Sequence, residues 1–312
     1  MQKLGEREPA RSDSRLAAAP SLAVQFFLIP LAVVAVVVAI YGGFRMMVAD
    51  ERTPEEYLND VRTGGRDRRW PAAYELARLM GDPELQAEHP DLAPALLRAF
   101  VQSDGDDPRI RRYLALAIGR LESPPSEAVA ALTTALDESD TETLISILWA
   151  LASLGDQAVV PEIVKLYQAT DPGVRKMVVY ALGVLPDDDG GEHRTLRSAL
   201  SDPVPDVQWN AAVSLARHGD GRGLTVLRRM LDREYVSEHV TPSETLADPT
   251  SEVMVSGLKA VAALGTVSVE ADLRGPVERL ADTDENLTVR EAAMETLGAL
   301  DGTPFEGNVA ER

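Results

Sequence analysis

The chain of 312 residues lacks cysteine altogether and contains few aromatic or basic residues. Without cysteine it can form no disulfide, no thiolate metal site and no cysteine nucleophile. Aromatic residues make up 5% of the chain, too few for the stacking platforms on which proteins hold unpaired bases. The chain has 50 acidic and 31 basic residues, which gives a formal net charge of −19. Because such a surface repels phosphate backbones, we expect no nucleic-acid partner.

Sequence motifs that carry chemistry are missing as well. The chain contains no nucleophile elbow, phosphate-binding loop or dinucleotide-binding fingerprint. Its four histidines include no pair at the i, i+4 spacing of a helical zinc site: His89, His193, His218 and His239. The acidic run at residues 187–189 lacks the alternating carboxylates and closing bidentate acid of a calcium loop. We therefore expect no metal, no cofactor, no small-molecule substrate and no catalysis.

One segment, residues 22–44, is apolar and carries no charge. As a helix its 23 residues would rise roughly 34 Å, against a hydrocarbon core of about 30 Å. Aromatic residues lie toward both of its ends, as in interfacial belts: Phe26, Phe27, Tyr41 and Phe44. We expect an uncleaved transmembrane helix that contacts the lipid bilayer. The alternative is a cleaved signal peptide, but the run is long for one and no small-x-small site follows it.

The flanking charges bear on the orientation of this segment. Four basic residues precede it within twenty positions, and three follow it within the same distance. Under the positive-inside rule this difference leans toward an N-terminus in the cytoplasm and a C-terminal part outside it. Because the difference is only one residue, the side of the membrane on which the C-terminal part lies stays open.

From residue 66 to residue 301 the sequence repeats one helical frame. Apolar or small residues follow most frame starts at offsets of four, eight and eleven, which lie on one face of an α-helix. The starts are 31 to 46 residues apart, as in helical repeats with insertions in loops: Arg68, Ile110, Thr143, Val174, Val207, Val253 and Val289. His218 replaces the leucine at offset eleven in its frame, and we expect it to be a hydrogen-bonded histidine at a helix end.

Between most of these frames lies a second apolar run, for example at residues 128–136, 159–166 and 224–231. We therefore interpret each frame as the first of two helices in a unit. Such a unit is too small to bury its apolar faces alone, so stacked units would share a continuous core and form a solenoid. The last unit shows only its first helix, which we expect to close the array.

Two stretches carry the repeat most clearly. Residues 171–185 read DPGVRKMVVYALGVL and residues 285–300 read ENLTVREAAMETLGAL. The pattern Asp/Asn-x-x-Val-Arg, followed by Ala-Leu-x-x-Leu, resembles bacterial HEAT-like repeats, including those of the phycobilin-lyase type, over residues 66–301. The resemblance implies an array that binds partners. We expect the motif arginines, such as Arg175, to pair with Asp107, Asp140, Asp171 and Asp206.

Two tryptophans are candidate binding residues. Trp70 and Trp209 occupy matching Trp-x-Ala-Ala-x-x-Leu-Ala-Arg stretches, at the edge of the predicted apolar face. Tryptophan at such an edge either packs between repeats or anchors a partner. We therefore keep both residues as candidates.

A further candidate is the longest break in the period, which includes residues 234–251. Its Ser, Thr, Pro and acidic residues cannot continue an apolar helix face, so we expect a surface loop. Insertions in solenoids are either idle or form a binding edge. In the second case Tyr235, Val236 and Val240 would supply apolar contacts and the neighbouring acids would steer a basic partner.

Together these features predict an all-α protein, an α-solenoid of about seven HEAT-like helical-hairpin repeats preceded by one transmembrane helix. The expected parts are a polar tail (1–21), the transmembrane helix (22–44), a juxtamembrane linker with a short helix (45–65), the solenoid (66–301) and a C-terminal tail (302–312). The expected function is a non-enzymatic scaffold tethered to a bacterial cytoplasmic membrane, with another protein of a membrane-associated complex as its partner. The alternative is a bilin-lyase-like or other HEAT-repeat enzyme acting on a protein.

Overall fold

The computed structural model describes residues 29–48, 52–186, 191–241 and 248–302. The chain divides into two compact units, Met1–Thr53 and Pro54–Arg312. Within the described residues the regular elements are all helical and no strand occurs. The predicted all-α class is therefore confirmed.

In the first unit, helix α2 (Ile29–Val48) covers much of the uncharged segment. Its side chains from residue 31 to residue 43 are exposed. In the part of the chain that the structure describes, no helix combines the length and the apolar character needed to cross a membrane. Residues 22–28 of the expected span lie outside that part.

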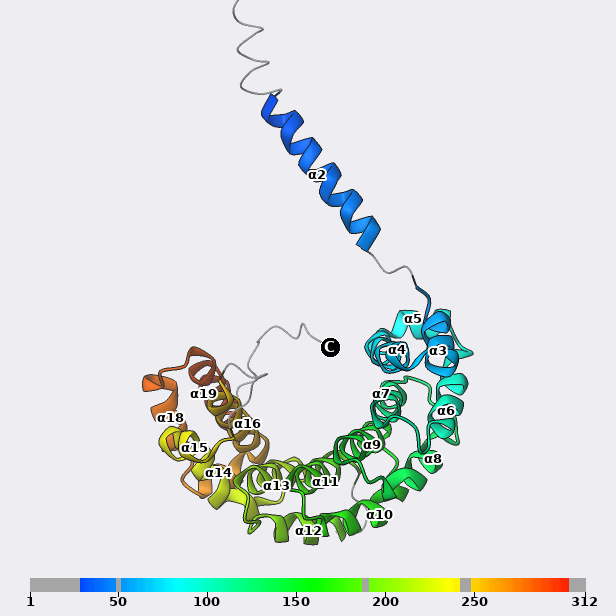
Figure 1. Ribbon diagram of the computed structural model, residues 1–312. Helices are drawn as coiled ribbons and strands as arrows, with labels where there is room; N and C mark the ends of the chain where they lie inside the picture. Colours follow the sequence, from blue (N-terminus) through cyan, green and yellow to red (C-terminus); the bar gives the residue numbers. More distant parts are fainter. Residues whose placement is uncertain (1–28, 49–51, 187–190, 242–247, 303–312) are drawn as a thin grey trace, which may run out of the picture. The chain divides into compact units, whose positions relative to one another are not determined.

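The second unit consists of helical hairpins that stack side by side along an arc (Figure 1). The helices of the outer row are α3 (Pro54–Thr63), α6 (Leu92–Gln102), α8 (Ala128–Thr134), α10 (Val160–Lys165), α12 (Gly191–Ala199), α14 (Leu224–Met230) and α18 (Arg274–Thr283). The helices of the inner row are α4 (Arg66–Leu79), α7 (Pro108–Gly119), α9 (Thr141–Leu154), α11 (Pro172–Val184), α13 (Pro205–Arg217), α16 (Pro249–Leu264) and α19 (Leu287–Leu300). Figure 1 shows this inner row along the concave side of the arc. The predicted solenoid of about seven hairpins is confirmed.

Short elements connect the hairpins. They are the helices α5 (Pro83–Glu88), α15 (Arg233–His239) and α17 (Thr266–Glu270), and the single 3₁₀ turns η2 (Ala135–Asp137), η3 (Gln157–Val159), η4 (Leu166–Gln168) and η5 (Gly221–Gly223). Of these, α15 lies between the outer helix α14 and the inner helix α16 of one hairpin. It is an insertion within a repeat.

The order of helices within a unit differs from the sequence-based interpretation. Each repeated frame is the second helix of its hairpin, because an outer helix precedes it. Helix α3, expected within the linker 45–65, is the first outer helix, and its Tyr57, Leu58 and Val61 are buried in the core. At the other end α18 pairs with α19, so the array ends on an inner helix rather than on an incomplete unit.

Aspartates start many of the inner helices. The side chain of Asp140 accepts a hydrogen bond from the Thr143 N–H at 2.9 Å, and Asp171 accepts one from the Val174 N–H at 3.0 Å. Proline follows Asp171 at the first helical position, where its missing N–H is not needed. The negative charge also suits the positive end of the helix. These aspartates therefore act as helix caps, which stabilise a helix by about 1 kcal/mol each.

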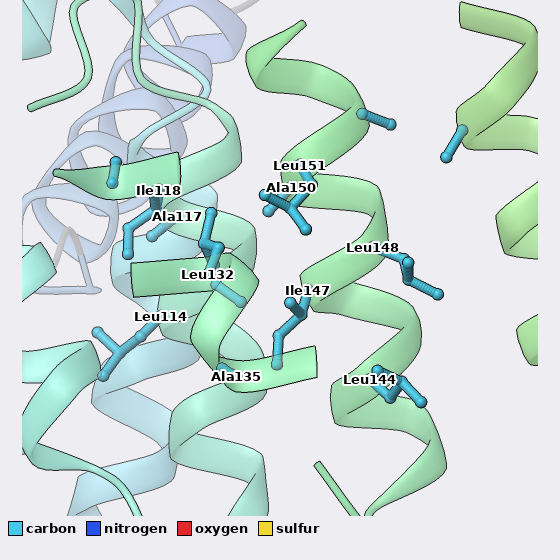
Figure 2. Close-up of a cluster of buried hydrophobic side chains, with 14 of the residues drawn as sticks. Leu114, Ala117, Ile118, Leu132, Ala135, Leu144, Ile147, Leu148, Ala150 and Leu151 are labelled. Atoms are coloured by element: carbon cyan, nitrogen blue, oxygen red, sulfur yellow. The ribbon is translucent and has the colours of Figure 1, made fainter. Parts of the chain in front are cut away.

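The predicted register is confirmed by burial of the inner helices. Residues at offset four are buried in every frame, and Leu151 and Leu182 at offset eight have no exposed surface. Figure 2 shows the packing between α7, α8 and α9: Leu132 of α8 lies beside Ile118 of α7, and Leu148 of α9 points away from both. Burial is less complete at other offsets: Arg68 at the first frame start is exposed, and Val253 and Leu297 are half-buried.

The motif arginines Arg69 and Arg175 join neighbouring hairpins, with other partners than those expected. Arg175 forms a bidentate pair with Asp202, with Nε–Oδ2 2.8 Å and Nη2–Oδ1 3.0 Å apart. Arg69 binds Asp106 at 3.1 Å in the same way. In both pairs the acid lies in the loop just before the next inner helix. The prediction of Arg–Asp pairing was right in kind and wrong in its partners.

Candidate functional site

Aromatic rings of the inner row lie beside arginines of the neighbouring inner helix. In three places a guanidinium carbon lies 4.8 to 5.8 Å from a ring centre: Arg109 over Trp70, Arg120 over Trp149 and Arg217 over Tyr180. The three rings are half-buried. Such contacts are worth about 0.5–1 kcal/mol at exposed sites. The inner row therefore presents flat apolar surface with positive charge beside it.

A groove of about 710 Å³ opens on this row between α11, α13 and α16, and we call it the α13 groove. Its apolar lining comes from Tyr180, Trp209, Val213, Met230, Val240 and Val253. Its charged lining comes from Lys176, Asp206, Arg217 and Glu252. The volume falls within the range of roughly 300–1,000 Å³ that ligand pockets occupy. Apolar walls with a few charges of both signs are the composition of a binding site.

The charges of the groove are partly engaged with each other. Lys176 Nζ lies 3.6 Å from Asp206 Oδ2, with the lysine side chain 46% exposed. At that exposure the pair contributes little to stability, so it can open for a ligand at small cost. Arg217 extends over the Tyr180 ring, and Glu252 is exposed. A bound segment can therefore meet a cation at one place and an acid at another.

Trp209 is the central apolar residue of the groove. Its side chain is 3% exposed, and its indole Nε1 has no hydrogen-bond partner among the described residues. Leaving a buried donor unpaired costs about 1–3 kcal/mol. An acceptor from a bound segment would remove that cost if the indole turned toward it.

The structure brings together two of the five predicted site residues. Trp209 and Val240 both line the α13 groove, the latter from the end of α15. Trp70 lies on α4 under Arg109 and does not line the groove. The ring of Tyr235 is half-buried and stacks on His239, with 4.2 Å between ring centres.

The expectation for Val236 and for the surrounding loop was wrong. Val236 is fully buried and packs in the core, so it can contact no partner. Residues 234–239 belong to α15, and residues 249–251 form the first turn of α16. The side chain of Asp232 starts α15 by accepting a hydrogen bond from the Tyr235 N–H. Residues 242–247 of the expected loop lie outside the described residues.

Most residues of the groove were not among the predicted site residues, for example Lys176, Tyr180, Val213 and Arg217. A signal for two of them exists in the repeat. Tyr180 and Val213 both stand at offset six of their frames, and Trp209 stands at offset two. Offset six lies on the side of the helix opposite the core offsets, and its residues here are half-buried, whereas Trp209 at offset two is buried. Aromatic residues at non-core offsets in consecutive frames would have indicated this surface.

The histidines of the described residues serve local structure. His218 Nε2 lies 3.0 Å from the Leu182 carbonyl oxygen of the neighbouring inner helix, which confirms the expected hydrogen-bonded histidine. His89 Nδ1 lies 2.6 Å from Glu55 Oε1 and links α5 to α3. Among the described residues no three potential metal ligands gather. The acidic run at residues 187–189 and the side chain of His193 lie outside what the structure describes.

The most deeply buried ion pair lies away from the groove, between α11 and the end of α12. Burial raises the pKa of the Asp202 carboxyl, but hydrogen bonds from Arg175 and from the Val204 N–H outweigh it and hold the pKa below its usual value. The Tyr167 hydroxyl lies 3.2 Å from Asp202 Oδ2. Burial and the neighbouring Asp202 charge raise the pKa of Tyr167 to about 12. This cluster joins two hairpins and has no opening to the groove.

Comparison with known proteins agrees with the repeat architecture. Residues 129–191, which include α8 to α11, match the family model of HEAT repeats. No curated protein matches the chain. Similar solved structures include an engineered protein with 20% identity over 81% of this chain and 99% of its own, TM-score 0.39. A designed armadillo repeat protein has 15% identity, covering 80% of this chain and 100% of its own, with a TM-score of 0.38. A second designed armadillo repeat protein, in complex with the peptide (KR)4, has 15% identity with the same two coverages and a TM-score of 0.42. The family match is confined to residues 129–191, in the middle of the chain.

Proposed function

We propose that this protein is a non-enzymatic scaffold that docks a segment of another protein in the α13 groove. The observation that carries the proposal is the groove itself, where Trp209, Val213 and Val253 form an apolar wall beside charges of both signs. A solenoid offers a long surface of this kind on one side of its stacked helices.

The partner that fits has an apolar anchor with polar groups on both sides. An apolar or aromatic side chain would pack against Trp209 and Val253. A carbonyl or carboxylate oxygen would accept a hydrogen bond from the indole N–H, and an acidic group would meet Arg217. Buried aromatic and arginine residues are the usual energetic centre of protein interfaces.

The proposal includes attachment to a bacterial cytoplasmic membrane through residues 22–44. Its support is the sequence, because the segment is uncharged over its whole length and extends beyond the described residues. The expected outcome is that the full chain stays with the membrane fraction after a carbonate wash and that a chain without residues 1–50 does not. Recovery of soluble protein that has lost its first 44 residues would instead identify a signal peptide.

The docking site is tested by photo-crosslinking within cells. A photoreactive amino acid replaces the exposed Ser256 of the groove, and in a matched chain it replaces the exposed Thr225 of the outer helix α14. We expect one main crosslinked protein from position 256 and none in common from position 225. Mass spectrometry of the crosslinked peptide then gives the bound segment. Equal crosslinks from both positions, or a crosslink only from position 225, would refute docking in the groove.

A further inference from the structure

At one position of the repeated frame, the residue is buried where the following inner helix packs against it. The residue at offset five has no exposed surface in the first six frames: Ala73, Ala115, Leu148, Val179, Ala212 and Leu258. Hydroxyl groups of the next inner helix reach the backbone here. Ser214 Oγ donates to the Val179 carbonyl at 3.0 Å, and Thr296 Oγ1 donates to the Leu258 carbonyl at 3.2 Å. In each of these frames, therefore, an α-helix covers this position.

The seventh frame has Met294 at offset five, and 51% of its surface is exposed. Leu287, seven residues earlier on the same side of α19, is 58% exposed. Glu291 and Glu295 lie beside them and are exposed as well. We call these four residues the α19 end face. It combines an apolar stripe about 10 Å long, at 1.5 Å per residue, with two carboxylates.

We infer that the α19 end face docks a basic amphipathic helix of another protein. A helix is the occupant that the repeat predicts, since a helix covers the same position in every other frame. A basic one fits because lysine or arginine beside its apolar residues would face Glu291 and Glu295. Recognition would follow the helix-in-groove mode, with apolar anchors at i, i+4 and i+7 meeting Leu287 and Met294.

Charge also argues against two other occupants. If a second copy of this chain packed α19 against α19, Glu291 and Glu295 of each copy would face those of the other. Like charges placed together cost affinity. Residues 303–312, which follow α19, read TPFEGNVAER and hold two acids against one arginine. Their proline and glycine also disfavour a helix.

The test uses the full chain in mild detergent and two synthetic helical peptides as probes. Both peptides carry leucine at i, i+4 and i+7; the remaining positions are mainly lysine in one and mainly glutamate in the other. We expect the lysine peptide to bind at least about tenfold more tightly than the glutamate peptide. Met294→Lys and Glu291→Lys should each weaken the lysine peptide by about tenfold or more, as loss of a hot-spot residue does.

Controls separate this site from general attraction to an acidic protein. Glu122→Lys makes the same charge change at an exposed site on another part of the chain, and Val101→Lys alters a residue 56% exposed on the outer helix α6. Both should leave binding within about twofold. All four residues are exposed, so the variants should keep the melting temperature of the unmodified chain.

Three results would overturn the inference. The first is equal weakening by the control variants. The second is a dimer of the full chain, seen in sedimentation, that Met294→Lys dissolves, because then a second copy covers the face. The third is peptide binding only after removal of residues 303–312, because then the chain's own segment is the occupant.

Discussion

The hairpins before and after α13 are joined in different ways. Before α13, a motif arginine binds an acid that precedes the next inner helix, as Arg175 does with Asp202. On α13 itself Gln208 replaces that arginine, and its side chain donates to the Asp202 carbonyl at 2.7 Å. At the junction of α16 with α19, where Met254 stands at the motif arginine position, Arg233 of the inserted α15 binds Asp284, with N–O distances of 2.6 and 2.9 Å. The insertion thus supplies, one junction after α13, the ion pair that the repeat motif supplies before α13.

The core divides at the same helix. Val207 and Leu215 of α13 belong to the hydrophobic cluster that extends back to α3, whereas Trp209 and Ala216 belong to the cluster that extends on to α19. The α13 groove opens on this helix, beside the end of the insertion. At a regular junction the side chains stack the hairpins on each other, whereas the groove that we propose as the binding surface lies where the period is interrupted.

The largest effect should come from removing the buried arginines on either side of α13. Arg175→Ala leaves Asp202, whose side chain is 3% exposed, without its partner, and Arg233→Ala does the same to Asp284 at 2%. Breaking such a pair costs about 3–5 kcal/mol. Arg69→Ala is the matched control, because the Arg69–Asp106 pair is about 30% exposed and should cost about 1 kcal/mol or less. Urea unfolding of each full-length variant measures the difference. Equal losses of stability for all three variants would contradict the difference between buried and exposed ion pairs.

Core leucines should give the next largest loss, in both clusters. Leu182→Ala before α13 and Leu258→Ala after it each remove a side chain with no exposed surface. The expected cost is about 2–5 kcal/mol for each. Circular dichroism during thermal and urea unfolding measures it. A cost below about half a kcal/mol at Leu182 would mean that the repeat register is wrong.

Close approach of inner helices should give a smaller loss. A Cβ on Gly183 would overlap the Ser214 side chain and come within 3.0 Å of its Cα, so Gly183→Ala should cost about 1–3 kcal/mol. Gly275→Ala is the control, because its nearest neighbour is the end of the Arg279 side chain at 3.8 Å. The same unfolding experiment compares them. Should the two variants prove equally stable, α11 and α13 are farther apart than described here.

The smallest expected effect is on the pH dependence of stability at acidic pH. Because burial, which raises the pKa of Asp202, is outweighed by its hydrogen bonds from Arg175 and Val204, the folded pKa lies below the usual value of about 4. The stabilisation is therefore complete above pH of about 4 and disappears as the pH falls through the folded pKa. Asp202→Asn should remove part of this dependence. If the slope of stability against pH is the same for both chains below pH of about 4, another carboxylate is responsible.

Much of the fold follows from the sequence because burial repeats at fixed offsets. Leu151 and Leu182 are core residues for that reason alone. The order of helices within a hairpin does not follow from the sequence, since links within and between hairpins have similar lengths. The same helix can therefore be assigned as the first or as the second helix of a unit. Helix α3 was therefore assigned to a linker.

The residues of the candidate site were harder to predict than the fold. Val236 sits in a polar segment, yet Asp232 caps a short helix there and turns the valine into the core. The α13 groove depends on side chains from α11, α13, α14 and α16 and from the end of α15, which no local pattern brings together. Trp209 was predicted from the matching tryptophan stretches, and Val240 because it lies in the longest break of the period; both line the groove. The contributions of Lys176 and Arg217 needed the structure.

The central claim is that the interrupted junction, rather than a regular one, binds the partner. The most direct measurement is the affinity of the crosslinked partner for the full chain and for three variants. Ser256→Arg and Val213→Arg place a bulky charge in the α13 groove, and Val184→Arg places it at the exposed end of α11, outside the groove lining. The account predicts that both groove variants weaken binding by about tenfold or more, while Val184→Arg binds as the unmodified chain does. Unchanged affinity of the folded Ser256→Arg chain, or an equal loss with Val184→Arg, would contradict it.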